Sequence, residues 1–453
     1  MTRTLLALLM GMLLAGSASA QPAADDTTPP DPQTTEASPA PKPDKARPIT
    51  MQHFRPYDQR GINIFETPKD AGVEYTGFKL DFGAAFTSQV QWLDHENAAV
   101  PVVVNGVDNN QLADIGFGFN NSTANLYLNA QLAKGIRVAL STYLSSRHHN
   151  ETWVKDGYIL IDGSPIENDM LDLLMHYMTL RIGHFEINYG DAHFRRTDNG
   201  NAIYNPFIGN YILDSFTTEI GAELYFRTKD FMVMGAVTGG EIRGTVLTPE
   251  KRGPAIIGKV GYDKQLRPDL RVRLTGSLYH TDKAMSNTLY GGDRAGSRYY
   301  YVLENTAATE SAQFTSGLIN PGFRNEITAM QLNPFVKFHG LEVFGVLERA
   351  EGKAVNEPAA RDIDQYAVDV VYRFLPGEKL FGGVRYNKVE GQLAGVTGDA
   401  GAERWQVGGG WFILPGLLAK VEYVNQKFTG YPPTHIRHGG KFHGVIAEGV
   451  VAF

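Results

Sequence analysis

Between residue 78 and the end of the chain, apolar and polar residues alternate with a period of two in every segment that lies between two turns or loops. The pattern is clearest at the start, where Phe78 and Leu80 fall on one face and Lys79 and Asp81 on the other. A strand of this kind has one apolar and one polar face. Repeated over most of the chain, it predicts an all-β fold, a closed transmembrane antiparallel β-barrel with one face toward lipid and the other toward water.

Counting the segments that show this alternation gives about sixteen strands, an even number as closure of a bacterial barrel usually requires. Besides the strand that begins at residue 78, the predicted strands are 123–133, 135–145, 153–162, 174–185, 217–227, 231–239, 255–264, 270–281, 327–338, 341–349, 365–375, 379–389, 403–414, 417–426 and 442–453.

Short connections with turn-favouring residues alternate with long ones. The short ones are 134–135, 228–230, 264–269, 339–340, 376–378 and 415–416, and the long ones reach 282–326. Outer-membrane barrels have short periplasmic turns and long extracellular loops, so both ends of the chain are expected in the periplasm. A soluble β-sandwich also has alternating strands, but here each strand carries an apolar face and a polar face with many charges, which favours the barrel.

The N-terminal part has a different composition. Residues 1–20 contain Arg3, an apolar run and a small-residue end at Ala20, which predicts a signal peptide and Sec-type export. The apolar run is shorter than the ~20 residues that a spanning helix needs. Residues 21–50 are rich in proline and are interpreted as a disordered periplasmic spacer. Residues 51–77 form a periplasmic N-terminal segment, either a short cap or a piece tucked into the barrel mouth, ahead of the barrel at 78–453.

Composition excludes several classes of function. The chain has no cysteine, which rules out disulfides and Cys-ligated metal or redox sites, and a net charge of −7 argues against nucleic-acid binding. No hydrolase or nucleotide-binding motif is present. His148–His149 and the pair His435 and His438 are interpreted as solvated loop residues rather than metal ligands. The sequence therefore predicts no catalytic residues, no metal, no cofactor and no enzyme.

A barrel of this size can enclose an aqueous channel. The connection 186–216 is too long and too rich in aromatic residues for a simple solvated loop, and we expect it to fold into the lumen as a constriction, with an outer lid or an inter-subunit latch as the alternative. Strand parity places further charges inside, where they either order water for small polar solutes or form structural ion pairs. The candidate pore or constriction residues are Arg181, Asp191, His193, Arg195, Arg196, Asp198, Glu223, Arg271 and Arg273.

Aromatic residues recur where strands run into the short turns. A membrane interface favours aromatic rings at one depth, so these residues are expected to form part of a periplasmic girdle. They are Phe226, Tyr262, Phe338, Phe374 and Phe453, the last residue of the chain.

The layout of the barrel region resembles the general porins of Gram-negative outer membranes, sixteen-stranded barrels whose third loop bends into the pore. A weaker resemblance, to the phosphate-selective porin family, lies in the stretches 180–186, Tyr189–Gly190 and 77–80. Glu186 stands where that family has a basic residue, so phosphate selectivity is not inherited. The resemblance alone implies a homotrimer.

The resulting hypothesis is an outer-membrane porin that passes small hydrophilic solutes or ions passively, through a barrel narrowed by the loop 186–216. Its expected surroundings are outer-membrane lipid and lipopolysaccharide. The alternative is a structural or adhesive barrel with a blocked lumen and partner-binding loops. A barrel hydrolase is the third hypothesis.

Overall fold

The computed structural model describes residues 51, 54–67, 69, 73–145, 152–244, 246–291, 296–309 and 314–453. The predicted signal peptide (1–20), the predicted spacer (21–50) and the pair His148–His149 lie outside these residues. All described residues belong to one structural unit. Within them, no helix has the length and apolar character needed to cross a membrane.

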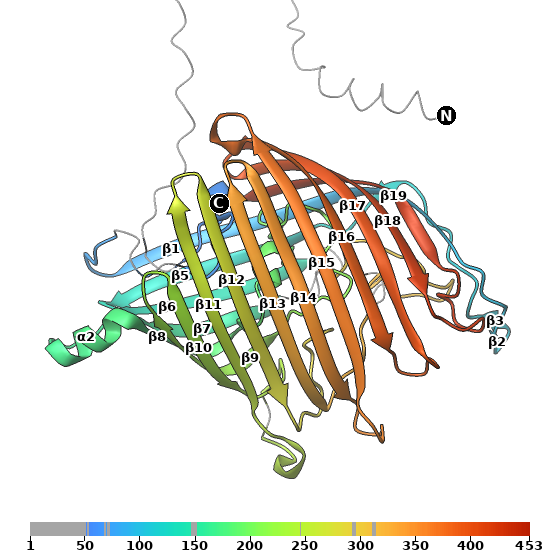
Figure 1. Ribbon diagram of the computed structural model, residues 1–453, viewed down its shortest axis with the longest axis horizontal. Coiled ribbons are helices and arrows are strands. Elements are labelled where there is room, and N and C mark those ends of the chain that lie inside the picture. Colours follow the sequence, from blue (N-terminus) through green and yellow to red (C-terminus); the bar gives the residue numbers. More distant parts are fainter. Residues whose placement is uncertain are drawn as a thin grey trace, which may run out of the picture. The chain divides into compact units, whose positions relative to one another are not determined.

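One antiparallel sheet closes on itself to form a barrel (Figure 1). The first strand, β1 (Lys79–Glu96), pairs with both β5 (Thr123–Ala133) and the last strand, β19 (Lys441–Ala452). The sheet has 17 strands, one of which, β4 (Gly118–Phe119), is a two-residue piece just before β5 that also pairs with β1. The wall therefore has sixteen full strands, which confirms the predicted barrel.

Most strand bounds agree with the predicted ones to within a few residues. The remaining wall strands are β6 (Ile136–Ser145), β7 (Trp153–Ile161), β8 (Met178–Glu186), β9 (Thr218–Arg227), β10 (Phe231–Thr238), β11 (Ala255–Arg267), β12 (Leu270–Thr281), β13 (Glu326–Phe338), β14 (Leu341–Lys353), β15 (Arg361–Phe374), β16 (Leu380–Gln392), β17 (Asp399–Leu414) and β18 (Leu417–Thr429). The connections also contain a hairpin, β2 (Val103–Val104) and β3 (Val107–Asp108), and the short 3-10 helices η1 (Gln59–Gly61), η2 (Ala192–Arg195), η3 (Pro249–Lys251) and η4 (Pro376–Glu378).

The C-terminal residue takes part in closing the barrel. The backbone of Phe453 exchanges two hydrogen bonds with Ala84 of β1, with N···O distances of 2.9 and 3.0 Å. Along β19 the residues alternate, so that Ile446 is buried inside while Val445 is exposed outside. The Phe453 side chain shares the outward direction and is exposed.

The connection between β7 and β8 differs from the prediction. The sequence predicts a strand over 174–185, but Asp169–Tyr177 form a helix, α2, and β8 begins only after it. The Asn168 side chain caps α2 by accepting hydrogen bonds from two backbone N–H groups of its first turn. The apolar residues of this segment have helical spacing, which a test for period-two alternation assigns wrongly.

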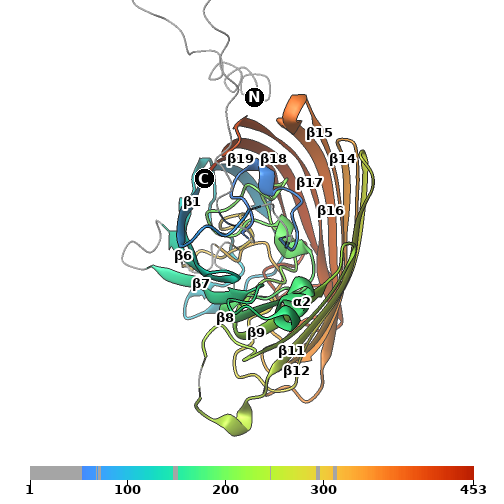
Figure 2. The same cartoon turned by 90° about the vertical axis from the view of Figure 1, so that its left-hand side faces the viewer.

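Three irregular segments occupy the space inside the ring of strands (Figure 2). The N-terminal segment is residues 54–67, and the inner loop is residues 187–217 between β8 and β9. The cover loop is the described part of the connection between β12 and β13, residues 282–291, 296–309 and 314–325. We call the end of the barrel with the short connections the turn end and the opposite end the loop end. The N-terminal segment lies at the turn end, where Gln59 N donates a hydrogen bond to Pro415 O (2.9 Å).

Candidate functional site in the lumen

The middle of the inner loop is bound to the inner face of β15 to β18. Tyr211 OH donates to Asp369 Oδ2 (3.0 Å), and Arg385 Nη1 donates to Gly209 O (3.0 Å). Arg385 also pairs with Asp369 at 2.6 Å, and both side chains are almost completely buried. Arg404 and Lys420 also donate to loop carbonyl groups. Gln365, Asn387 and Glu422 accept from loop N–H groups. These wall residues satisfy loop groups that have lost contact with water.

The cover loop packs on the inner loop and fills more of the lumen on the side of β15 to β18. Ile319 N donates to Ile212 O of the inner loop (2.9 Å), and Tyr299 OH donates to Glu422 Oε1 of the wall (2.6 Å). Both Tyr299 and Ile319 are fully buried. We call the inner faces of β11 to β19, together with the loop segments bound to them, the packed half of the lumen.

The N-terminal segment contacts both the wall and the inner loop. Glu66 pairs with Arg273 (2.7 Å) and Lys259 (3.0 Å) on the wall, and Tyr57 stacks on Tyr127 with ring centroids 4.0 Å apart. The contacts of residues 54–67 are with the inner face of the wall, on which a piece inside the barrel mouth would lie. The segment thereby narrows the turn end of the lumen from within.

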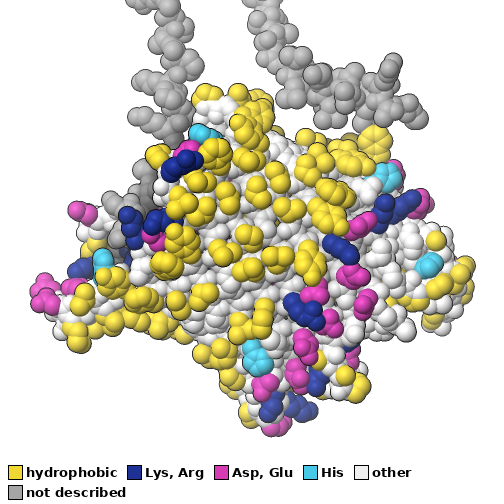
Figure 3. Space-filling view, viewed as in Figure 1, with side chains coloured by type: hydrophobic (Ala, Val, Ile, Leu, Met, Phe, Trp, Pro, Cys, Tyr) yellow, Lys and Arg dark blue, Asp and Glu magenta, His cyan; other side chains and the backbone are white. Residues whose placement is uncertain are grey.

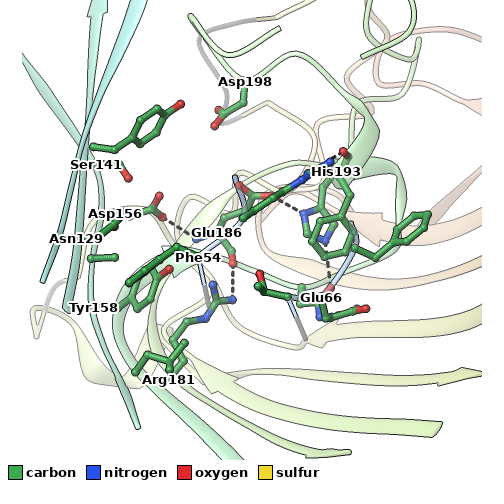
Figure 4. Close-up of a pocket in the computed structure, with 18 of the residues that line it drawn as sticks. Phe54, Glu66, Asn129, Ser141, Asp156, Tyr158, Arg181, Glu186, His193 and Asp198 are labelled. Atoms are coloured by element: carbon green, nitrogen blue, oxygen red, sulfur yellow. Dashed lines mark hydrogen bonds and ion pairs between the residues drawn. The ribbon is translucent and has the colours of Figure 1, made fainter. Parts of the chain in front are cut away.

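A cavity of about 230 Å³ remains between the inner loop, the N-terminal segment and the inner faces of β5 to β9 (Figure 4). We call these inner faces, with the cavity, the cavity half of the lumen. Its polar lining comes from the wall and from the inner loop and carries both signs of charge. The charged residues from these two sources are Lys155, Asp156, Arg181, Glu186, Arg196, Asp198 and Arg227.

Lys155 projects into this cavity because β7 contains a β-bulge. Ser141 of β6 pairs with Asp156 and Thr142 pairs with Val154, so Lys155 is the extra residue between two pairs. A bulge breaks the alternation of directions, and the result is that Lys155 and Asp156 are both buried in the lumen.

The ammonium group of Lys155 joins the wall to the inner loop. It is paired with Asp198 of the loop, lies 2.8 Å from Glu186 Oε2 at the end of β8, and lies 3.6 Å from Asp156 Oδ2. His193 of the inner loop also hydrogen-bonds Glu186 through its Nδ1 atom. In Figure 4 Glu186, His193 and Asp156 lie around this meeting point of strand and loop.

A second hollow, of about 560 Å³, lies on the loop-end side and shares Lys155 with the cavity. It is also lined by Tyr143 and Phe216, whose ring centroids lie 5.9 and 5.5 Å from the Lys155 ammonium nitrogen. Lys155 is therefore part of the boundary between the two spaces.

The structure distributes the nine predicted constriction residues between the two halves. Those that line the cavity are Arg181, His193, Arg196 and Asp198. Glu223 does not line it but pairs with Arg181 behind it.

The other four predicted residues do not line the cavity and belong to ion pairs, which are buried for Asp191, Arg195 and Arg273 and partly exposed for Arg271. Arg273 donates to both carboxylate oxygens of Asp191 (2.8 and 2.9 Å). Arg195 lies 3.3 Å from Glu342 at the opposite wall, and Arg271 pairs with Asp263 at 2.6 Å. For these residues the geometry matches the alternative of structural ion pairs.

Sequence reasoning did not select Lys155, Asp156 or Glu186 as site residues. The available signal was two adjacent charged residues, Lys155 and Asp156, in a strand that otherwise alternates. Adjacent charges in such a strand indicate a bulge, since strict alternation would place one of them in lipid.

Burial and ion pairing shift the pKa values of His193 and Glu66, which both line the cavity. Burial lowers the pKa of His193 below its usual 6.5, and the hydrogen bond to Glu186 opposes this only partly. Burial alone would raise the pKa of Glu66, but Arg273 and Lys259 hold it well below its usual range. We therefore expect a neutral His193 and an ionised Glu66 at neutral pH.

The five predicted girdle residues lie close to the turn end. Phe226, Phe338, Phe374 and Phe453 are exposed, and each ends its strand or is within one residue of the end. Tyr262 is half-buried and lies farther from its strand end, because β11 continues to Arg267 through an irregularity in its pairing with β12. Among the described residues, no group of three or more His, Asp or Glu side chains is arranged to hold a metal ion.

Comparisons with known proteins find similarity of structure only. No protein-family model matches the chain, and no curated protein matches its sequence. An anion-selective porin from Comamonas acidovorans aligns with a TM-score of 0.50 and 12% identity, over 83% of this chain and 100% of that chain.

Two other solved structures align somewhat less well. OprB of Pseudomonas putida has a TM-score of 0.49 and 10% identity, over 83% of this chain and 94% of its own. The outer membrane channel DcaP of Acinetobacter baumannii has a TM-score of 0.46 and 10% identity, over 84% of this chain and 99% of its own. With its sixteen strands and closed order, this chain has the barrel fold of the outer-membrane porins.

Proposed function

We propose that the protein is a bacterial outer-membrane channel for the passive diffusion of ions and small hydrophilic solutes, with its path in the cavity half of the lumen. The observation that carries this proposal is the polar cavity beside Lys155, which shares that residue with the hollow on the loop-end side. The path would run from the loop end past Lys155 and then between the inner loop and β5 to β9. The turn end would face the periplasm.

The charges of the cavity indicate what kind of solute fits it. The lining has five cationic and four anionic residues, so it has no large excess of one sign. The cationic ones are Arg55, Lys155, Arg181, Arg196 and Arg227, and the anionic ones are Glu66, Asp156, Glu186 and Asp198. Facing charges of both signs order water across a lumen and favour small polar solutes over large or apolar ones. A strongly anion-selective pore would require more unbalanced cations than this lining contains.

A second candidate is a barrel with a blocked lumen, whose long loops bind a partner. The observation that favours it is the filling of the packed half, where both the inner loop and the cover loop are fully buried at Tyr211 and Tyr299. Export by a signal peptide, contact with lipopolysaccharide and assembly as a homotrimer stay predictions of either candidate.

Single-channel recording separates the two candidates. The purified mature chain should give discrete current steps in a planar bilayer bathed in KCl. Insertion is checked independently, by the resistance of the barrel to protease in liposomes. A protease-resistant, inserted barrel that carries no current would contradict the channel and support the blocked scaffold.

A further inference from the structure

Helix α2 carries an apolar edge that no part of the described protein covers. Its side chains at Met170, Leu173, Leu174 and Tyr177 are 72%, 66%, 49% and 38% exposed. These positions follow the i, i+3, i+4, i+7 spacing that places residues on one side of a helix. An exposed apolar edge of this kind on a nine-residue helix marks a contact surface.

The opposite edge of α2 fixes the direction in which the apolar edge points. Asp172 lies 3.8 Å from Lys134 of the turn between β5 and β6, and Met175 lines a hollow at the turn end together with Arg137 of the inner wall. The edge that carries Asp172 and Met175, which we call the polar edge after its carboxylate, is therefore held over the rim of the barrel. The apolar edge consequently points away from the lumen.

The apolar edge continues directly into the outer surface of the barrel wall. Tyr177 stacks on Phe226 with ring centroids 5.7 Å apart, and Phe226 is an outward-facing residue near the end of β9. Leu224 precedes it on the same face and is also exposed. Figure 3 shows hydrophobic side chains running from the helix onto the wall. In an outer-membrane barrel this outward face is the surface that meets lipid.

From this arrangement we propose that α2 is an interfacial helix that lies in the phospholipid leaflet at the turn end of the barrel. Its apolar edge occupies the boundary between headgroups and acyl chains, as amphipathic helices do. Its polar edge faces the water at the barrel mouth. Tyr177 of the helix thereby adds a ring next to Phe226 at the membrane boundary of the wall. The helix also anchors the connection between β7 and β8 to the membrane surface. The inference depends on the barrel spanning a membrane and does not depend on conduction.

The absence of cysteine in the chain permits a direct test with single spin labels. Leu173→Cys and Leu174→Cys place a label on the apolar edge, and Asp172→Cys is the matched control on the polar edge. Leu174 and Asp172 lie almost on opposite sides, because each residue turns an α-helix by about 100°. All three sites are exposed, so the substitutions leave the packing of the barrel unchanged.

The full mature chain is labelled in vesicles of phosphatidylethanolamine and phosphatidylglycerol, and the label's accessibility to oxygen and to a water-soluble nickel chelate is measured. At 173 and 174 the proposal predicts high accessibility to oxygen and low accessibility to the chelate, with the reverse at 172. High chelate accessibility at all three sites would overturn the proposal, because the helix would then project into water. Labels at 173 and 174 that are shielded from both probes and show dipolar broadening between copies would also overturn it, in favour of a contact with a second chain.

Discussion

In the packed half of the lumen, Arg385 and Lys420 are 0% and 1% exposed and bind the backbone of the inner loop. In the cavity half, Arg181 and Glu186 keep 16% and 20% of their side chains exposed and border an open space. Both halves use pairs of opposite charges on strands of the same barrel. The difference is that residues 207–213 of the inner loop are packed against one wall, whereas the loop meets the other wall at residues 198–200 and leaves the cavity beside that contact. In the proposed channel, the position of the inner loop, rather than the charge of the wall, determines where solutes pass.

The largest expected effect comes from removing the N-terminal segment, since it forms one side of the cavity. Deletion of residues 54–67 should raise the single-channel conductance several-fold, because a wider and shorter constriction has a lower resistance. Glu66→Ala removes the pairs with Lys259 and Arg273 and the hydrogen bond from Asn188, and it should raise the conductance less. A folded deletion variant with unchanged conductance would place the segment outside the current path.

Lys155 should control ion preference more than any other single residue of the wall. Lys155→Gln leaves Asp156, Glu186 and Asp198 without their shared cation. The reversal potential in a KCl gradient should therefore shift strongly toward that of a cation-selective channel. Lys155→Arg should restore the original value.

The matched control for this substitution lies in the packed half. Lys420→Gln removes a lysine of similar burial, but one that is paired with Glu448 and bound to the inner loop. Its reversal potential should stay that of the unmodified protein. Equal shifts for Lys155→Gln and Lys420→Gln would remove the distinction between the two halves.

Arg385 should matter for stability rather than for ion preference. Arg385→Leu leaves Asp369 buried and unpaired, which costs about 3–5 kcal/mol of unfolding free energy for a buried pair of this kind. Urea unfolding followed by tryptophan fluorescence in detergent measures the loss. The double variant Asp369→Asn with Arg385→Leu should recover much of it, and no recovery would mean that the pair is not the source of the loss.

The smallest effect is a pH dependence from His193. Its lowered pKa keeps it neutral at pH 7, and acidification well below pH 6.5 adds a positive charge beside Glu186. The reversal potential should therefore move away from that of a cation-selective channel as the pH falls through this range. His193→Asn should remove the step in reversal potential, and a step that persists in this variant would assign it to another group.

The barrel was predictable because alternation is a local property of each strand, and the same pattern fixed the outward direction of Phe453. The inner loop was recognisable by its length and its aromatic residues. Lys155 was not recognisable as a lumen residue, because a bulge reverses the side-chain direction that strand alternation assigns. The place of the N-terminal segment depends on pairs such as Glu66 with Arg273, which lie too far apart in sequence for any local pattern to reveal. Helix α2 was misassigned because its apolar residues were tested only against the period of a strand.

Cysteine substitution tests the central claim most directly, since the chain has no cysteine of its own. Ser141 and Ser277 are both inward-facing serines with 7% exposure, but Ser141 lines the cavity whereas Ser277 lies between Lys259 and Gln331 of the packed half. A charged methanethiosulfonate reagent applied to single channels should reduce the current of Ser141→Cys and leave that of Ser277→Cys unchanged. A reduced current in Ser277→Cys with no change in Ser141→Cys would contradict the account.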